Sequence, residues 1–144
     1  MIVLSLTRGY AIMTDITRTV ADFVADLAYA DLPDEVIERT KLLIFDVTGV
    51  MIRARHDAES TPSLIAAVER LGLASGDCSV PGDARAYAPS AAALINGTLA
   101  HSLDFDDTHA AGSLHSSAPI VPAAMAAAEM VNASGKGLIA AGVA

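Results

Sequence analysis

Apolar residues recur every three or four positions along most of the chain, which is the spacing of one face of an α-helix. The first such stripe predicts a helix that ends near residue 29 and has Thr14 or Asp15 as its N-cap. A second helix is predicted over residues 33–54, because a proline and two acidic side chains suit its first turn. A third stripe predicts a helix over residues 61–71.

Residues 73–88 interrupt this pattern with glycine, serine, aspartate and proline, so we expect an irregular segment there with a brief extended stretch at 84–87. Helices return beyond it. One Ala-rich helix is predicted from Pro89 toward His101, a second over about 118–131, and a final apolar helix after Gly135. The pattern therefore predicts an all-α protein, an Ala-rich helical bundle with one irregular segment near 73–88.

The two ends of the chain fit this bundle less well. Residues 1–12 begin with a short apolar run that lacks the positive segment and cleavage site of a signal peptide. We expect them to be an N-terminal extension, disordered or loosely docked, and residues 13–144 to form the helical domain. The last apolar helix reaches Ala144 without a stop signal, so we expect this domain to be truncated at its C-terminus.

Composition narrows the class of protein. A chain of 144 residues, 53% of them hydrophobic, can form one domain with a core. No apolar run is long enough to span a membrane, and a net charge of −8 argues against nucleic acid or an anionic membrane as partner. The apolar content instead favours burial against a second subunit or a missing domain. One cysteine, Cys78, excludes an internal disulfide and suits the reducing cytoplasm.

The densest group of aspartates and histidines lies in residues 96–115, NGTLAHSLDFDDTHAAGSLH. Three of the four histidines are here, and three aspartates fall within four positions. Because the surrounding sequence is apolar and rich in alanine, we expect the cluster at the edge of a core. So much polarity in one place favours acid–base or metal chemistry.

Spacing within this cluster suggests roles. Gly97, His101 and Asp104 share a helix face if the helix continues, because they are four and three positions apart. The glycine would allow backbone or substrate to approach closely. The crowded negative charge of Asp104, Asp106 and Asp107 makes one carboxyl easier to protonate, which suits an acid or a base.

His115 stands just before the second Ala-rich helix, where the positive end of the helix dipole favours a neutral imidazole that can act as a base. Structural interpretations stand beside the chemical ones. His101 would be a partly buried histidine held by a carboxylate, the aspartates a solvated capping loop, and His115 part of the packing where the helix begins. Three histidines so close together favour the chemical interpretation.

Three mechanisms compete for the cluster. Metal binding has suitable ligands, but no HxH, HExxH or CxxC spacing is present. Residues 104–108 read as DxDxT, a phosphoryl-transfer motif, yet that motif must follow a buried strand and here it follows an Ala-rich helix, so we regard the match as coincidence. The third mechanism is metal-free proton abstraction beside a carboxylate, with histidine as base and Asp and Thr as positioning groups.

The motifs of this region resemble the MmgE/PrpD family, and the similarity covers about Ile16 to the C-terminus. The residues that carry it are Asn96-Gly97, Ala100-His101, Leu103–His109, His115, Ala118-Pro119 and Pro122–Ala124, with Leu32–Val36 and Leu43–Val50 earlier in the chain.

The resemblance implies a largely helical main domain, a smaller second domain formed by later sequence, and a homodimer. It implies lyase or isomerase chemistry on small di- or tricarboxylates, as in 2-methylcitrate dehydratase, without metal or organic cofactor. By position, His115 and Asp104 would be catalytic, and Thr108, Asp104 and His101 would bind substrate. Supporting roles would fall to Asn96, Gly97, Asp106, Asp107 and His109.

One position departs from the family pattern. The family usually has His-Pro where this chain has His115-Ser116. Since proline fixes the first turn of a helix, we expect a looser start to the helix that follows and a less constrained His115.

The scarcity of lysine and arginine in the second half of the chain indicates that the site is incomplete. Lys136 is the only lysine or arginine after Arg85, and one cation cannot neutralise two or three substrate carboxylates. We therefore expect an N-terminal fragment that is inactive alone and works as a homodimer or with a complementing C-terminal half. The alternatives are a non-catalytic helical interaction module and a metal-dependent hydrolase that uses the Asp/His cluster.

Overall fold

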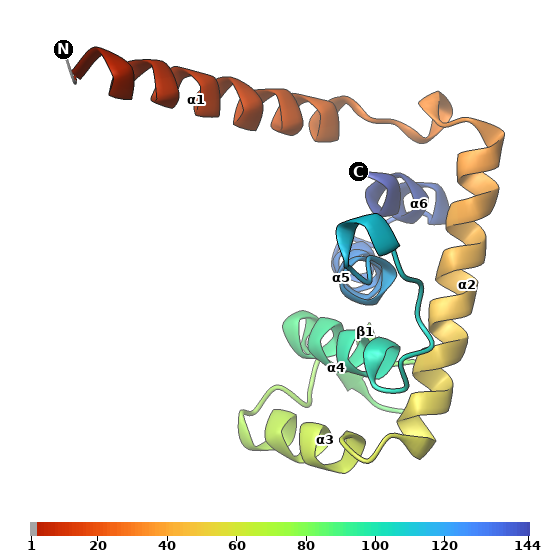
Figure 1. The fold of residues 1–144 in the computed structure, drawn as a ribbon. Helices are drawn as coiled ribbons and strands as arrows, with labels where there is room; N and C mark the ends of the chain where they lie inside the picture. Colours follow the sequence, from red (N-terminus) through yellow and green to blue (C-terminus); the bar gives the residue numbers. More distant parts are fainter. Residues whose placement is uncertain (1–2) are drawn as a thin grey trace.

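A computed structural model describes the backbone of residues 3–144 and the side chains of residues 15–144. In this part of the chain the structure is six α-helices, two 3-10 turns and one two-stranded sheet, which confirms the predicted all-α fold. The helix α2 (Asp34–Asp57) is its spine. Four later helices contact α2 and lie beside one another along it (Figure 1): α3 (Thr61–Arg70), α4 (Pro89–His101), α5 (Ser117–Met130) and α6 (Gly135–Val143).

The first helix, α1 (Val3–Asp26), begins earlier than the sequence predicts. The expected start was Thr14 or Asp15, but the helix continues back through residues 3–12 because no proline interrupts them and a single glycine costs only about 1 kcal/mol. Residues 1 and 2 lie outside the described residues. That residues 1–12 are an extension of the domain stays a prediction.

α1 projects from the bundle as an arm (Figure 1). Its apolar stripe is on the surface, with Ile16, Val20 and Phe23 each more than half exposed. The helix stops at Asp26, and a 3-10 turn, η1 (Tyr29–Asp31), leads into α2, with the Asp31 carboxylate accepting a hydrogen bond from the Ala28 N–H at 3.1 Å. No other helix of the described chain therefore covers the apolar stripe of this arm.

α2 forms where the sequence places it, although it runs to Asp57 rather than residue 54. Asp34 and Glu35 lie in its first turn and Arg55 and His56 in its last, so each end of the helix dipole meets the opposite charge. One face is buried and supplies Val47, Met51 and other residues to the core. The other face leaves a second apolar stripe exposed, at Leu42, Phe45 and Ile52.

The centre of the core is the contact between α4 and α5. Both helices bury mainly small residues, including Ala91, Ala92 and Ala118, so their backbones approach closely. A Cβ on Gly97 would lie 3.5 Å from the Ala118 carbonyl oxygen, which is an ordinary contact distance. Ile95 and Leu99 of α4 fill the remaining space toward α2, and both are fully buried.

Residues 73–88 are irregular, as predicted, and contain only the two short strands β1 (Cys78–Ser79) and β2 (Ala86–Tyr87). The strands pair antiparallel, with Cys78 opposite Tyr87. Gly76 is required here, because a Cβ at this position would lie 2.3 Å from the Tyr87 carbonyl oxygen. Burial raises the pKa of the Cys78 thiol, which fits a structural side chain rather than a nucleophile.

None of the described helices combines the length and the apolar character that a membrane-crossing segment needs.

Asp83 fastens the irregular segment to α2. Its carboxylate accepts hydrogen bonds from the guanidinium groups of Arg55 and Arg85, with closest distances of 3.0 and 3.1 Å, and from the Tyr87 hydroxyl at 2.8 Å. The Arg85 contact, together with those from Tyr87 and Arg55, holds the pKa of Asp83 well below its usual range. Arg55 belongs to α2, so the network joins a loop without regular structure to the spine of the bundle.

We expect Asp83→Asn to lower the free energy of unfolding at pH 7 by about 1–3 kcal/mol, because it removes the charge shared by three donors. A depressed folded-state pKa gives stability that is present above the unfolded value of about 4 and is lost as the pH falls through the folded value. The difference between the two proteins should therefore narrow toward about pH 2. Urea unfolding followed by circular dichroism measures it.

Asp77→Asn is the matched control, since Asp77 is an exposed carboxylate of the same segment. Its effect should stay within about 0.5 kcal/mol. Equal losses from the two substitutions, or a difference that does not change with pH, would show that the Asp83 network does not hold the segment.

Candidate functional site

The candidate site lies where α4 ends and α5 begins. His101 is the last residue of α4, and His115 comes two residues before the first residue of α5. Because the two helices pack side by side, the loop between them returns over its own start. Asp104 makes the turn: its φ of 55° is left-handed, and its N–H donates to the His101 carbonyl at 3.0 Å. Aspartate is one of the few non-glycine residues that tolerate this conformation.

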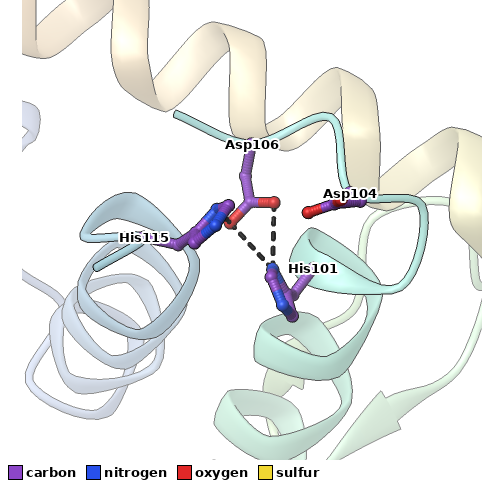
Figure 2. A group of neighbouring side chains, drawn as sticks. All are labelled: His101, Asp104, Asp106 and His115. Atoms are coloured by element: carbon purple, nitrogen blue, oxygen red, sulfur yellow. Dashed lines mark hydrogen bonds and ion pairs between the residues drawn. The ribbon is translucent and has the colours of Figure 1, made fainter. Parts of the chain in front are cut away.

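Asp106 lies at the centre of the site (Figure 2). Its side chain has no exposed surface, whereas the side chains of His101 and His115 are 54% and 32% exposed. His101 Nδ1 is 3.0 Å from one carboxylate oxygen of Asp106 and 3.1 Å from the other. A buried carboxylate needs hydrogen-bond donors, and the His101 ring is close enough to supply one in the tautomer with hydrogen on Nδ1.

His115 approaches the same carboxylate from α5. Its Nδ1 lies 3.2 Å from Asp106 Oδ2, close enough for an ion pair, but the angles do not meet those of a hydrogen bond, and this nitrogen has no other partner. The rings of His101 and His115 meet edge to face, with centroids 4.8 Å apart. The distances therefore show that His115 lies against Asp106, and a rotation of the imidazole ring would be needed to form a hydrogen bond between them.

Asp104 joins these three residues. One ligand-type atom from each of His101, Asp104, Asp106 and His115 lies within 4.8 Å of the others. We call these four residues the Asp/His cluster. No lysine or arginine in the described part of the chain forms an ion pair with it. The cations nearest in sequence are used elsewhere: Arg85 pairs with Asp83 and Glu69, and Lys136 lies over the ring of Tyr29.

A cavity of about 740 Å³ lies between α4 and α5 and is lined by both histidines of the cluster. Its walls are otherwise mostly small or apolar, with Gly97, Leu94 and Ala118 among them. Pro122 has no N–H, so it cannot donate to the carbonyl of Ala118 four residues earlier, and that carbonyl faces Gly97. Gly97 thus forms part of the cavity wall, and that it allows backbone or substrate to approach closely stays a prediction.

The other predicted site residues hold the surrounding structure. The Asp107 carboxylate accepts from the Ser117 N–H at 3.1 Å and from the Ser116 hydroxyl at 3.4 Å, so it caps the start of α5. Asn96, fully buried, donates from Nδ2 to the Ser79 carbonyl at 3.0 Å and ties α4 to β1. Ser116, which stands where the family resemblance led us to expect proline, thus contacts Asp107 through its hydroxyl.

Thr108 and His109 lie outside the Asp/His cluster. Thr108 is exposed, and in the described part of the chain no hydrogen bond or ion pair joins it to the four residues. His109 Nδ1 accepts a hydrogen bond from the Gly112 N–H at 2.9 Å and closes a turn. Sequence reasoning gave Asp106 a supporting role and did not foresee its central place, since nothing in its spacing distinguishes it from Asp104 or Asp107.

The arrangement suits proton transfer. Two imidazoles meet a buried carboxylate beside an open cavity, and each ring keeps a second nitrogen that Asp106 does not contact. A histidine oriented by a buried carboxylate can accept a proton at that nitrogen and return it, with the carboxylate stabilising the charged ring. The same four side chains are also of the types that bind divalent transition metals.

Comparison with known proteins gives the relationship. The chain is 34% identical over 118 residues to the cis-aconitate decarboxylase-like protein oryM of Aspergillus oryzae, which covers 81% of this chain and 24% of that protein. It is 31% identical over 123 residues to the cis-aconitate decarboxylase of Aspergillus terreus, covering 84% and 24%. The human cis-aconitate decarboxylase is 32% identical over 126 residues, covering 86% and 25%.

The chain therefore spans about a quarter of the length of these relatives. No solved structure matches it. The sequence model of the MmgE/PrpD N-terminal domain matches residues 18–144, which is nearly all of the helical bundle and the whole of the Asp/His cluster. This chain belongs to the MmgE/PrpD family.

Proposed function

We propose that this chain is the N-terminal part of an enzyme that performs cofactor-independent acid–base lyase chemistry on a small di- or tricarboxylate. The observation that carries the proposal is the pair of imidazoles held at Asp106 and open to a cavity. Cis-aconitate is the first substrate to test, because the relatives named above are cis-aconitate decarboxylases. 2-Methylcitrate, which the family resemblance suggested, is the second.

Both reactions need the same help from the protein. Loss of CO2 from a carboxylate leaves an electron pair on carbon, and an acid must deliver a proton to it. Dehydration removes a proton beside a carboxylate and protonates the hydroxyl that leaves as water. His115 is our candidate for the proton transfer, with Asp104 beside it, and Thr108 is our candidate for binding a substrate carboxylate. Such acid–base help is typically worth about 10²–10⁴ in rate.

The site of this chain is half of what the reaction needs. Two or three substrate carboxylates require cationic partners, and the Asp/His cluster adds negative charge of its own. The missing cations would come from a C-terminal half or from a second copy of the chain. The cytoplasm suits this enzyme, since its single cysteine is buried and unpaired.

We expect purified residues 1–144 to release no CO2 from cis-aconitate and to dehydrate no 2-methylcitrate above the buffer rate. The Aspergillus terreus enzyme assayed alongside is the positive control. Robust turnover by the chain alone would falsify the idea of an incomplete site. If a complementing half restores activity, His115→Ala should lower the rate by about 10²–10⁴, while the exposed His56→Ala should not change it.

We also expect the chain to associate with itself, as both the incomplete enzyme and the alternative of a non-catalytic interaction module would do. The stripes on α1 and α2 expose large apolar side chains, Phe45 at 79% and Ile16 at 60%. We expect light scattering after size exclusion to show a dimer or larger species, and Phe45→Lys to weaken it. Leu71→Lys, which changes an exposed leucine outside both stripes, is the control. A monodisperse monomer with little hydrophobic-dye binding would contradict both interpretations.

The metal-dependent hydrolase is the remaining alternative, because four suitable side chains converge. Zinc binds nitrogen and oxygen at about 2.0–2.2 Å, so its tetrahedral ligands lie about 3.4 Å apart. The distances of 3.0 and 3.1 Å between His101 and Asp106 are those of a direct hydrogen bond instead. We expect elemental analysis to find far less than one Zn, Mn or Mg per chain. A stoichiometric metal that Asp106→Asn removes and His56→Ala retains would show a metal site at the cluster and favour this alternative.

A further inference from the structure

We propose that Asp106 is a positioning residue that holds both His101 and His115 in the tautomer with hydrogen on Nδ1, and so presents the two Nε2 atoms as proton acceptors. The catalytic use of those atoms rests on the proposed function above. The tautomers do not, and they can be measured without any substrate.

The first step is the burial of Asp106. Its side chain has no exposed surface, so water cannot solvate the carboxylate. Within the described chain its ion-pair partners are His101 and His115. A buried carboxylate with no hydrogen-bond donor is costly, so the hydrogens must come from these two rings.

The second step concerns which nitrogen faces the carboxylate. In both rings it is Nδ1, at 3.0 and 3.1 Å from Asp106 for His101 and 3.2 Å for His115. A bare Nδ1 would set its lone pair against the lone pairs of the carboxylate. A hydrogen on Nδ1 turns that repulsion into attraction, and in a neutral imidazole Nε2 is then bare.

His115 gives the strongest reason to place the hydrogen on Nδ1. Its Nδ1 is buried and has no hydrogen-bond partner as placed. Asp106 Oδ2 is the acceptor within reach, so a modest ring rotation would complete the bond. One carboxylate offers about four lone-pair sites, which is enough for two imidazole donors.

The third step is what this leaves for chemistry. Both rings line the cavity between α4 and α5, while Asp106 does not. Asp106 therefore acts through the histidines: it sets which nitrogen is bare, and it stabilises the ring that has accepted a proton. In an isolated neutral histidine no such partner selects the Nδ1–H form.

The chain contains its own opposite case. His109 Nδ1 accepts a hydrogen bond from the Gly112 N–H at 2.9 Å, so this nitrogen must be bare. Neutral His109 should therefore carry its hydrogen on Nε2. His109 lies in the same loop as Asp106, which makes it an internal reference for the measurement.

The experiment is long-range ¹H–¹⁵N NMR of the whole chain with labelled histidine, at about pH 8.5 where an ordinary imidazole is neutral, and with a metal chelator present. We expect the Nδ1–H pattern at His101 and His115 and the Nε2–H pattern at His109. Single histidine substitutions assign the signals. Nε2–H patterns at both cluster rings, or an Nδ1–H pattern at His101 alone, would overturn the shared role of Asp106.

Asp106→Asn sharpens the test. An amide has no negative charge and places an NH2 donor where the carboxylate has its second acceptor oxygen, so a hydrogen on Nδ1 is less strongly favoured and the Nδ1–H population summed over the two rings should fall. His109 should not change. Asp104→Asn, an exposed carboxylate of the same cluster, should leave all three tautomers as they were. An Asp106→Asn protein that keeps both Nδ1–H patterns in full would contradict the proposal. If this variant does not fold, the tautomer patterns of the wild-type protein alone test the role of Asp106.

Discussion

The close packing of α4 against α5 is the contact on which the site depends. Alanine and glycine at this interface let the two backbones approach, as Gly97 beside the Ala118 carbonyl shows. That approach brings the end of α4 next to the start of α5 and places His101 and His115 with their ring centroids 4.8 Å apart. Larger side chains on either helix would separate the rings and leave Asp106 accessible to water.

The rest of the fold keeps these two helices in place. α2 contacts both of them, as well as α3 and α6, along one face. Asp83 ties the irregular segment to α2 through Arg55, and Asn96 ties α4 to the same segment through Ser79. Asp107 caps α5 from within the site loop. Several polar residues next to the site therefore serve the scaffold, and their substitution would disturb the cluster without taking part in its chemistry.

The charges around the Asp/His cluster limit which ligands this part of the chain can bind alone. The cluster combines two histidines with two carboxylates, and no described lysine or arginine forms an ion pair with it. A substrate with several carboxylates would meet net repulsion here unless another segment supplied cations. The exposed stripes of α1 and α2 also suggest a further segment or partner, because they are apolar surfaces that the described chain does not cover.

Local features of the sequence determined the elements of this protein. Apolar spacing, the acidic first turn of α2 and the prolines at the start of α3 and α4 act within a few residues, so helices and the irregular segment near 73–88 could be predicted. The start of α1 was the exception, since nothing between residues 3 and 14 forbids a helix and the boundary has no strong signal. The position of the cluster, within residues 96–115, could also be predicted from the density of aspartates and histidines there.

Only the tertiary structure decided the role of each member. Asp104, Asp106 and Asp107 are nearly equivalent in the sequence, yet one makes a left-handed turn, one is buried between two histidines and one caps a helix. These differences depend on how deeply the loop sinks between α4 and α5 and on partners up to ten residues away. Burial and hydrogen-bond partners are properties of the packed chain, and no local pattern encodes them.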